Sequence, residues 1–150
     1  MTNTIAIHRI TPANTVLLDD IAPDVFDAPI DATRLSAYVA ERNHALFIAT
    51  DADTVVAQGR GMVHHSPDEA PVLYIDNFGV APTHQRRGIG TRLFAALRAW
   101  AKDEGATTVW LATETDNEQA KAFYAALGLT PSTVVYFERN GRLHPPASSA

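Results

Sequence analysis

Cysteine is absent from this chain of 150 residues, which excludes disulfides, a thiol nucleophile and cysteine metal sites. The sequence also lacks an apolar run of about 20 residues, the length that a helix needs to cross a bilayer. Its first ten residues lack the basic and apolar stretches of a signal peptide. Basic residues are too few for a large basic face, since 12 Lys and Arg stand against 17 Asp and Glu. We therefore expect a cytoplasmic protein without a nucleic-acid or membrane partner.

No repeat, linker or block of charge divides the chain, and its length suits one domain with a sizeable core. The only low-complexity stretch is the end of the sequence, where Pro145, Pro146, Ser148 and Ser149 occur together. We predict a single domain over residues 1–143 and a disordered tail over residues 144–150.

Hydrophobic periodicity predicts the order of the elements. Residues 11–32 combine three prolines with several aspartates, which indicates a broken helix and loop. We expect helices over residues 33–43 and 88–104, and a third that begins with a capping box at Thr115 and Glu118. We expect strands over residues 5–10, 45–49, 54–65, 72–80, 107–112 and 134–138. Antiparallel strands come first and a strand–helix–strand unit second, so we predict an α/β (α+β) fold: a mixed, mostly antiparallel central sheet of six to seven strands, flanked by about four helices.

The most informative stretch links the strand over residues 72–80 to the helix that follows, and we call residues 80–90 the cradle. Arg86 and Arg87 precede two glycines, Gly88 and Gly90, at the start of the helix. A helix N-terminus offers free N–H groups and a partial positive charge, and glycine lets phosphate oxygens approach the backbone. The pattern therefore favours a pyrophosphate site. The alternative is a surface loop in which the arginines are solvated and the glycines only permit tight packing.

Two other phosphate motifs fit the cradle poorly. The lysine and hydroxyl residue that end a P-loop are missing, and Leu93 stands where the dinucleotide fingerprint needs a third glycine. The histidines do not suggest a metal site either. His64 and His65 are adjacent in a strand and point to opposite faces, so they cannot easily share one ion, and we expect His84 to be exposed to solvent.

Residues 85–90, Gln-Arg-Arg-Gly-Ile-Gly, resemble the Gln/Arg-x-x-Gly-x-Gly/Ala signature of the GNAT acetyltransferase superfamily. Residues 73–80 look like the fourth strand of that superfamily. A second set of residues resembles its second cofactor motif: Asn117, Ala120, Phe123, Tyr124, Leu127 and Gly128. The resemblance covers about residues 72–129, and within the superfamily the chain is most similar to the aminoglycoside 3-N-acetyltransferase group.

This resemblance implies acetyl-CoA as co-substrate and no metal. It implies that the cofactor pyrophosphate binds at the cradle and that pantetheine runs beside the strand before it. It also places Asn117 and Tyr124 at the cofactor. The implied contacts of the pyrophosphate are Gln85, Arg86, Arg87, Gly88, Ile89, Gly90 and Thr91, and those of pantetheine are Phe78, Gly79 and Val80.

The reaction expels a thiolate, to which a phenol can donate a proton, and Tyr124 matches the family tyrosine with that role. The acceptor must become a neutral amine, which requires a base or a water relay. Asp76 is the first candidate base and Glu114 the second, and both could also bind substrate. Asp24 and Asp27, in the acidic early segment, could hold a cationic acceptor. For each of these residues a structural role stays open: a core aromatic for Tyr124, a helix cap for Asn117, a sheet hydrogen bond for Asp76 and solvation for the two loop aspartates.

We therefore expect an N-acetyltransferase that moves acetyl from acetyl-CoA to a small cationic amine, such as an aminoglycoside or a polyamine, by direct attack in a ternary complex. The alternatives are an acyl-CoA-binding sensor without turnover and a transferase for longer acyl chains. The sequence departs from the family pattern in two places. Asn77 stands where related sequences often carry an acid, and the chain has room for only one strand after its last helix. A homodimer could cover the side that this leaves open.

Overall fold

The computed structural model describes residues 4–139, and the chain divides into two compact units between residues 112 and 113. The first unit holds a five-stranded sheet: β1 (Ile5–Arg9), β2 (His44–Asp51), β3 (Thr54–His64), β4 (Val72–Val80) and β5 (Thr108–Trp110). The strands lie in chain order, antiparallel from β1 to β4 and parallel between β4 and β5. This confirms the predicted mixed, mostly antiparallel fold, with fewer strands than the six to seven expected.

Among the described residues there are three α-helices and two short 3-10 helices. These are η1 (Thr15–Asp19), α1 (Ala32–Ala40), η2 (Pro82–His84), α2 (Ile89–Asp103) and α3 (Glu118–Ala126). The predicted broken helix over residues 11–32 is η1 with irregular chain on both sides. Asp31 caps α1, because its side chain accepts a hydrogen bond of 2.8 Å from the Arg34 N–H.

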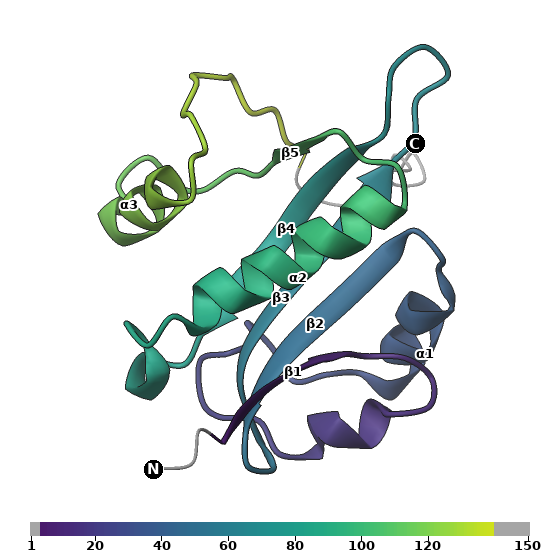
Figure 1. The fold of residues 1–150 in the computed structure, drawn as a ribbon, viewed down its shortest axis with the longest axis vertical. Helices are drawn as coiled ribbons and strands as arrows, with labels where there is room; N and C mark the ends of the chain where they lie inside the picture. The colour runs from purple at the N-terminus through teal and green to yellow at the C-terminus, as the bar shows by residue number, and fades with distance from the viewer. Residues whose placement is uncertain (1–3, 140–150) are drawn as a thin grey trace, which may run out of the picture. The chain divides into compact units, whose positions relative to one another are not determined.

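Helix α2 lies across one face of the sheet (Figure 1). Its predicted apolar stripe is buried, including Ile89, Leu93, Leu97 and Trp100. Contact is so close that a Cβ added at Gly59 would lie 2.9 Å from the Phe78 ring and 3.0 Å from Leu97. A side chain at position 59 would therefore have to displace the Phe78 ring of β4 and Leu97 of α2. Gly105, with φ of 91°, follows the end of α2 as the sequence predicts.

The second unit begins at Thr113 and includes α3. The predicted capping box is wrong, because Asn117 and not Thr115 caps this helix: the Asn117 side chain accepts from the Ala120 N–H at 3.1 Å. The predicted strand over residues 134–138 is also wrong, because these residues form no strand. A strand needs a hydrogen-bonded neighbour, and the described part of this unit contains no second strand to provide one. The predicted tail over residues 144–150 lies outside the described residues.

Candidate functional site

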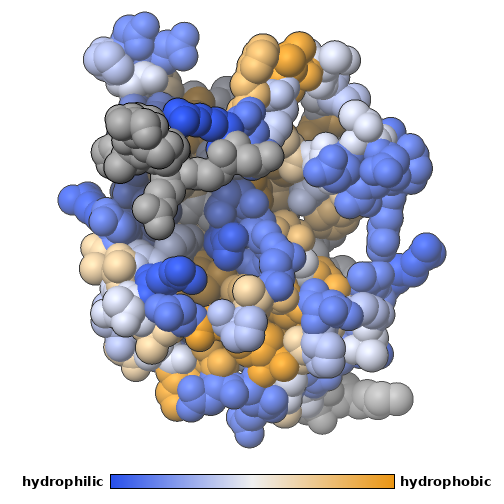
Figure 2. All heavy atoms as spheres, turned by 180° about the vertical axis from the view of Figure 1, so that it is seen from behind, coloured by the Kyte–Doolittle hydropathy of each residue, from blue (hydrophilic) through white to orange (hydrophobic). Residues whose placement is uncertain are grey.

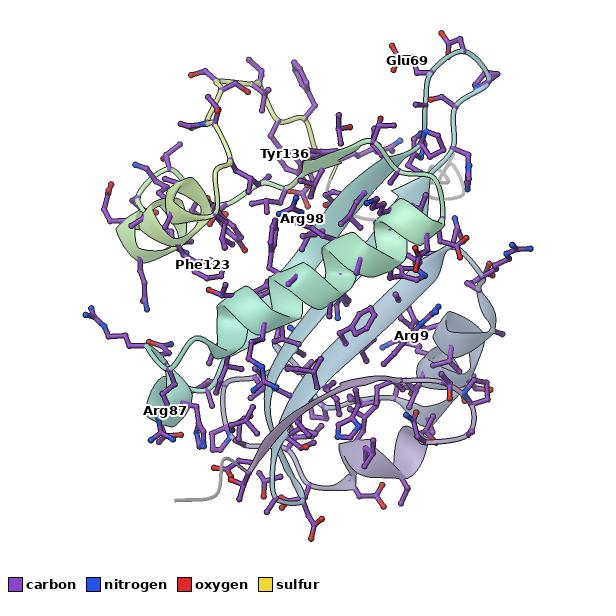
Figure 3. The ribbon with its side chains drawn as sticks, in the orientation of Figure 1. Arg9, Glu69, Arg87, Arg98, Phe123 and Tyr136 are labelled. Carbon is purple, nitrogen blue, oxygen red and sulfur yellow. The ribbon has the colours of Figure 1, made fainter. Side chains whose placement is uncertain are left out.

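The cradle turns from the end of β4 into the start of α2, and Figure 3 shows Arg87 in this turn. Two backbone positions give it its shape. Arg86 has φ of 63° and Gly88 has φ of 77°, both in the left-handed region that glycine adopts at least cost. Gly88 is the N-cap of α2, and no side chain caps the helix there. A helix N-terminus without a side-chain cap suits an anion site, which the sequence analysis predicts here.

Hydrogen bonds on both sides hold the cradle in place. The Gln85 side chain donates to the Val80 carbonyl at 3.2 Å, which closes the loop on itself. His84 Nε2 lies 2.8 Å from Oδ2 of Asp51, the last residue of β2. The prediction that His84 is solvent-exposed is therefore wrong: its side chain is mostly buried against that carboxylate. Hydrogen bonds from Thr4 and then from His84 lower the pKa of Asp51.

In the described residues, β5 pairs with only the first part of the strand before the cradle. β5 pairs with β4 only from Val72 to Tyr74, and Trp110 is its last residue. The second half of β4, which holds Phe78, Gly79 and Val80, has no β5 residue beside it. All three are half-buried. An edge of this kind can accept the amide groups of an extended ligand, which is the arrangement that the resemblance implies for pantetheine.

A β-bulge in β4 decides where its polar side chains point. Arg60 on β3 is opposite Asn77, whereas the next residue of β3, Gly61, is opposite Ile75. Asp76 is the extra residue. Neighbouring residues of a regular strand face opposite ways, but a bulge can bring two of them to one side.

The contacts of Asp76 and Asn77 show that both lie on the same face. Arg60 Nε donates to Asp76 Oδ2 at 2.8 Å, and Gln58 Nε2 donates to Asn77 Oδ1. Gln58 and Arg60 are two residues apart on β3 and therefore share a face, whereas Gly59 between them faces α2. We call the side with Gln58 and Arg60 the far face. Figure 2 shows the molecule from behind, where hydrophilic and hydrophobic side chains are mixed.

The irregular chain between η1 and α1, which we call the early loop, brings the Asp27 carboxylate to this face. Val25 is 2% exposed, and its carbonyl accepts from Gln58 Nε2 at 3.3 Å. The loop lies so close to β4 that a Cβ added at Gly79 would be 3.0 Å from that carbonyl oxygen. Two residues later, Asp27 Oδ2 accepts from Asn77 Nδ2 at 2.9 Å. Asp27 and Asp76 thus reach the same face from different parts of the chain. Asp24 is exposed, with φ of 65°.

Sequence reasoning missed Gln58, although a signal was present: a lone amide inside the apolar run Val55–Gly59, which is typical of a buried polar contact. Tyr38 on α1 was also missed. Its hydroxyl donates to the Ala45 carbonyl at 3.0 Å. Burial, and then the charge of Asp76, raises the pKa of Tyr38.

The remaining candidates belong to the second unit and are described by themselves. Tyr124 on α3 is half-buried and packs edge-to-face on Phe123, with ring centroids 5.2 Å apart. Burial raises the pKa of Tyr124, so its hydroxyl keeps its proton near neutral pH. Glu114 is exposed, and its carbonyl accepts from the Asn117 N–H at 3.1 Å. Asn117 is the helix cap.

Residues 4–139 contain no group of three or more His, Asp or Glu side chains placed to hold a metal ion. Within the same residues, no helix is both long and apolar enough to cross a membrane.

Residues 14–129 match the Acetyltransferase (GNAT) family. The chain belongs to this family, which makes it an N-acetyltransferase with acetyl-CoA as co-substrate. The family match includes the cradle, the far face and α3.

Several of its relatives are named for aminoglycosides. The chain is 28% identical over 138 residues to an aminoglycoside N(6')-acetyltransferase type 1 of Stenotrophomonas maltophilia, covering 87% of this chain and 90% of that protein. It is 32% identical to an uncharacterised protein of Mycobacterium leprae, covering 97% of this chain but only 38% of that longer protein. These comparisons do not confirm the predicted 3-N group, because the aminoglycoside relatives carry N(6') names.

Solved structures share the fold. An aminoglycoside acetyltransferase from an uncultured soil metagenomic sample, in complex with sisomicin, has a TM-score of 0.77 at 20% identity, covering 93% of this chain and 98% of that one. AAC(6')-Iy in complex with a bisubstrate analogue also has a TM-score of 0.77, at 19% identity, covering 92% of this chain and 99% of that one.

Proposed function

We propose that this enzyme acetylates the 6'-amino group of an aminoglycoside. The observation that carries the proposal is the β4 bulge, which brings Asp76 to the same face as the loop carboxylate Asp27. Aminoglycosides carry several ammonium groups, and carboxylates on one face suit a polycation. The N(6') names of the relatives support the choice of amine.

For acetyl-CoA, we propose that the pyrophosphate binds backbone N–H groups of the cradle, from Gln85 to Gly90, and of Thr91 in the first turn of α2. Arg86 and Arg87 add positive charge. Pantetheine then extends along the second half of β4 at Phe78, Gly79 and Val80. The missing side-chain cap of α2 and the short β4–β5 ladder support this placement.

The reaction we propose is a direct attack. The neutral amine attacks the thioester carbonyl, the new C–N bond forms, the C–S bond breaks, and the thiolate leaves. Asp76 takes a proton from the ammonium group, directly or through water, and Tyr124 donates its hydroxyl proton to the thiolate. The second proton, which the attacking nitrogen loses as it becomes an amide, returns to Tyr124 through water. Holding the amine and thioester together supplies much of the rate. Glu114 is the second candidate base, Asp24 and Asp27 bind the cation, and Asn117 contacts the cofactor besides capping α3.

We also propose that the enzyme is a cytoplasmic homodimer. Four consecutive large apolar residues in the second unit are 76–86% exposed: Val134, Val135, Tyr136 and Phe137. An exposed apolar segment of high β-propensity is a common partner-binding surface. A monomer at tens of micromolar in analytical ultracentrifugation would contradict the dimer.

The family match crosses the boundary between the units, which supports one acetyltransferase domain over residues 1–143.

A thiol-release assay tests the function. We expect acetyl-CoA to be consumed with an aminoglycoside that carries a 6'-amine and not with its 6'-hydroxyl counterpart, and NMR of the product to place the acetyl group on that nitrogen. Release with polyamines alone would overturn the acceptor. Binding of CoA by calorimetry without turnover on any amine would overturn the activity in favour of a sensor.

A further inference from the structure

A chain of side-chain amides connects the sheet interior to the loop carboxylate on the far face. It begins at Gln58, which is 0% exposed, and continues through Asn77 to Asp27. None of the roles assigned above requires this chain.

The direction of these hydrogen bonds is fixed at the buried end. The Val25 carbonyl can only accept, so the side-chain group of Gln58 that faces it must be the NH₂ group. That NH₂ also donates to Asn77 Oδ1. Asn77 must therefore turn its own NH₂ towards Asp27, where it donates at 2.9 Å. Donors thus point outwards at every step and end on a carboxylate, which such a donor stabilises in its ionised form.

An acid at position 77 could not do this. A carboxylate has no hydrogen to donate to Asp27, and two carboxylates at this distance would repel each other. Asn77 is thus compatible with a carboxylate that arrives from the loop.

We propose that Gln58 and Asn77 are positioning residues that hold the Asp27 carboxylate on the far face, where it binds an ammonium group of the acceptor. This rests on the proposed function, because it assumes a cationic amine as acceptor. Asn77 directly precedes Phe78, where the proposed pantetheine site begins, so the held carboxylate lies beside the end of β4 that the cofactor uses. Asp27 is exposed and uses only Oδ2 in the contact with Asn77, and a carboxylate has further lone pairs for a ligand.

The test compares Asp27→Asn, Asn77→Leu and the double variant. For each, kcat, both KM values and the calorimetric Kd for sisomicin are measured. We expect each single variant to raise the KM and Kd for the acceptor about tenfold, as for one charge-assisted contact, with kcat and the KM for acetyl-CoA unchanged. Because Asn77 acts through Asp27, the double variant should be no worse than Asp27→Asn alone.

Glu69→Gln is the matched control. It also removes one negative charge, but from the tip of the loop between β3 and β4 (Figure 3), and we expect the acceptor Kd of the wild type. Should Asn77→Leu unfold, Asn77→Ser provides a smaller polar replacement that adds no charge and has no amide group, and it should also raise the acceptor KM.

The outcomes separate this inference from the proposed function. Wild-type turnover with an acceptor KM that Asp27→Asn leaves unchanged would overturn the inference and keep the function. An acceptor KM that rises in Asp27→Asn but not in Asn77→Leu or Asn77→Ser would overturn the positioning role. Calorimetric binding of sisomicin that depends on Asp27 and Asn77, without any turnover, would keep the inference and overturn the function. No binding by the wild type would overturn the inference.

Discussion

The cradle and the far face are built in different ways. The cradle offers mainly backbone groups, shaped by a left-handed glycine at the start of α2, and the residues that form it are consecutive. The far face offers side chains from the early loop, β3 and β4, and a single extra residue in β4 decides which of them meet. A backbone site tolerates many side-chain changes but few backbone changes, whereas a side-chain site has the opposite sensitivity.

The largest expected effect lies on the far face. Asp76→Asn should lower kcat about thousandfold if this carboxylate is the base, since general acid–base groups contribute about 10²–10⁴. Arg60→Gln removes the ion-pair partner of Asp76 but leaves the Asp76 carboxylate, so this variant should keep most of the activity. Steady-state kinetics of the two variants decide between a base and a structural ion pair. Equal losses of kcat in the two variants would indicate that the Asp76–Arg60 ion pair matters and that Asp76 is not the base.

Tyr124→Phe should lower kcat about hundredfold, because the departing thiolate loses its proton donor. The KM for acetyl-CoA should change little. Tyr136→Phe removes the same hydroxyl from a residue that is 78% exposed and serves as the comparison. The raised pKa of Tyr124 predicts that the donor stays protonated up to its ordinary value of about 10, so it should cause no loss of rate between pH 7 and 9. An intact kcat in Tyr124→Phe would refute its role.

In the cradle, Gly88→Ala should weaken CoA binding about tenfold, because an L-residue in the left-handed region costs about 1–2 kcal/mol. Gly105→Ala is a close control. Both glycines have positive φ, and a Cβ at either would meet no atom within 4 Å. Both variants should lose similar stability in urea unfolding, but only Gly88→Ala should lose affinity for CoA in calorimetry. Equal CoA affinity in the two would show that the cradle does not depend on its backbone shape.

The smallest effect concerns the support of the far face. Tyr38→Phe removes the hydrogen bond to Ala45 and should lower the free energy of unfolding by about 1 kcal/mol at pH 7. The pKa of Tyr38 is raised in the folded state, so its contribution is present below pH about 10, the unfolded value, and is lost as the pH rises above it. The wild type should therefore lose stability in alkali more steeply than Tyr38→Phe. Parallel curves above pH 10 would contradict this.

The sequence by itself determined the cradle and most of the framework. Glycines, arginines and the apolar stripe of α2 are local signals within some 20 consecutive residues, and the order of strands and helices is enough for a mixed sheet. The last strand was mispredicted because β-propensity at residues 134–138 does not supply a pairing partner. The cap of α3 was misplaced by two residues, because Thr115 and Asn117 are both good caps.

Only the tertiary structure decided the far face. The meeting of Asp27 with Asn77 joins residues 50 apart in the chain, and alternation along a regular strand would have put Asp76 and Asn77 on opposite faces. The bulge arises from the register between β3 and β4, which depends on packing across the sheet and is not encoded in any short motif. The local pattern therefore determines how the cofactor is held, whereas long-range register determines which carboxylates are placed to receive the amine.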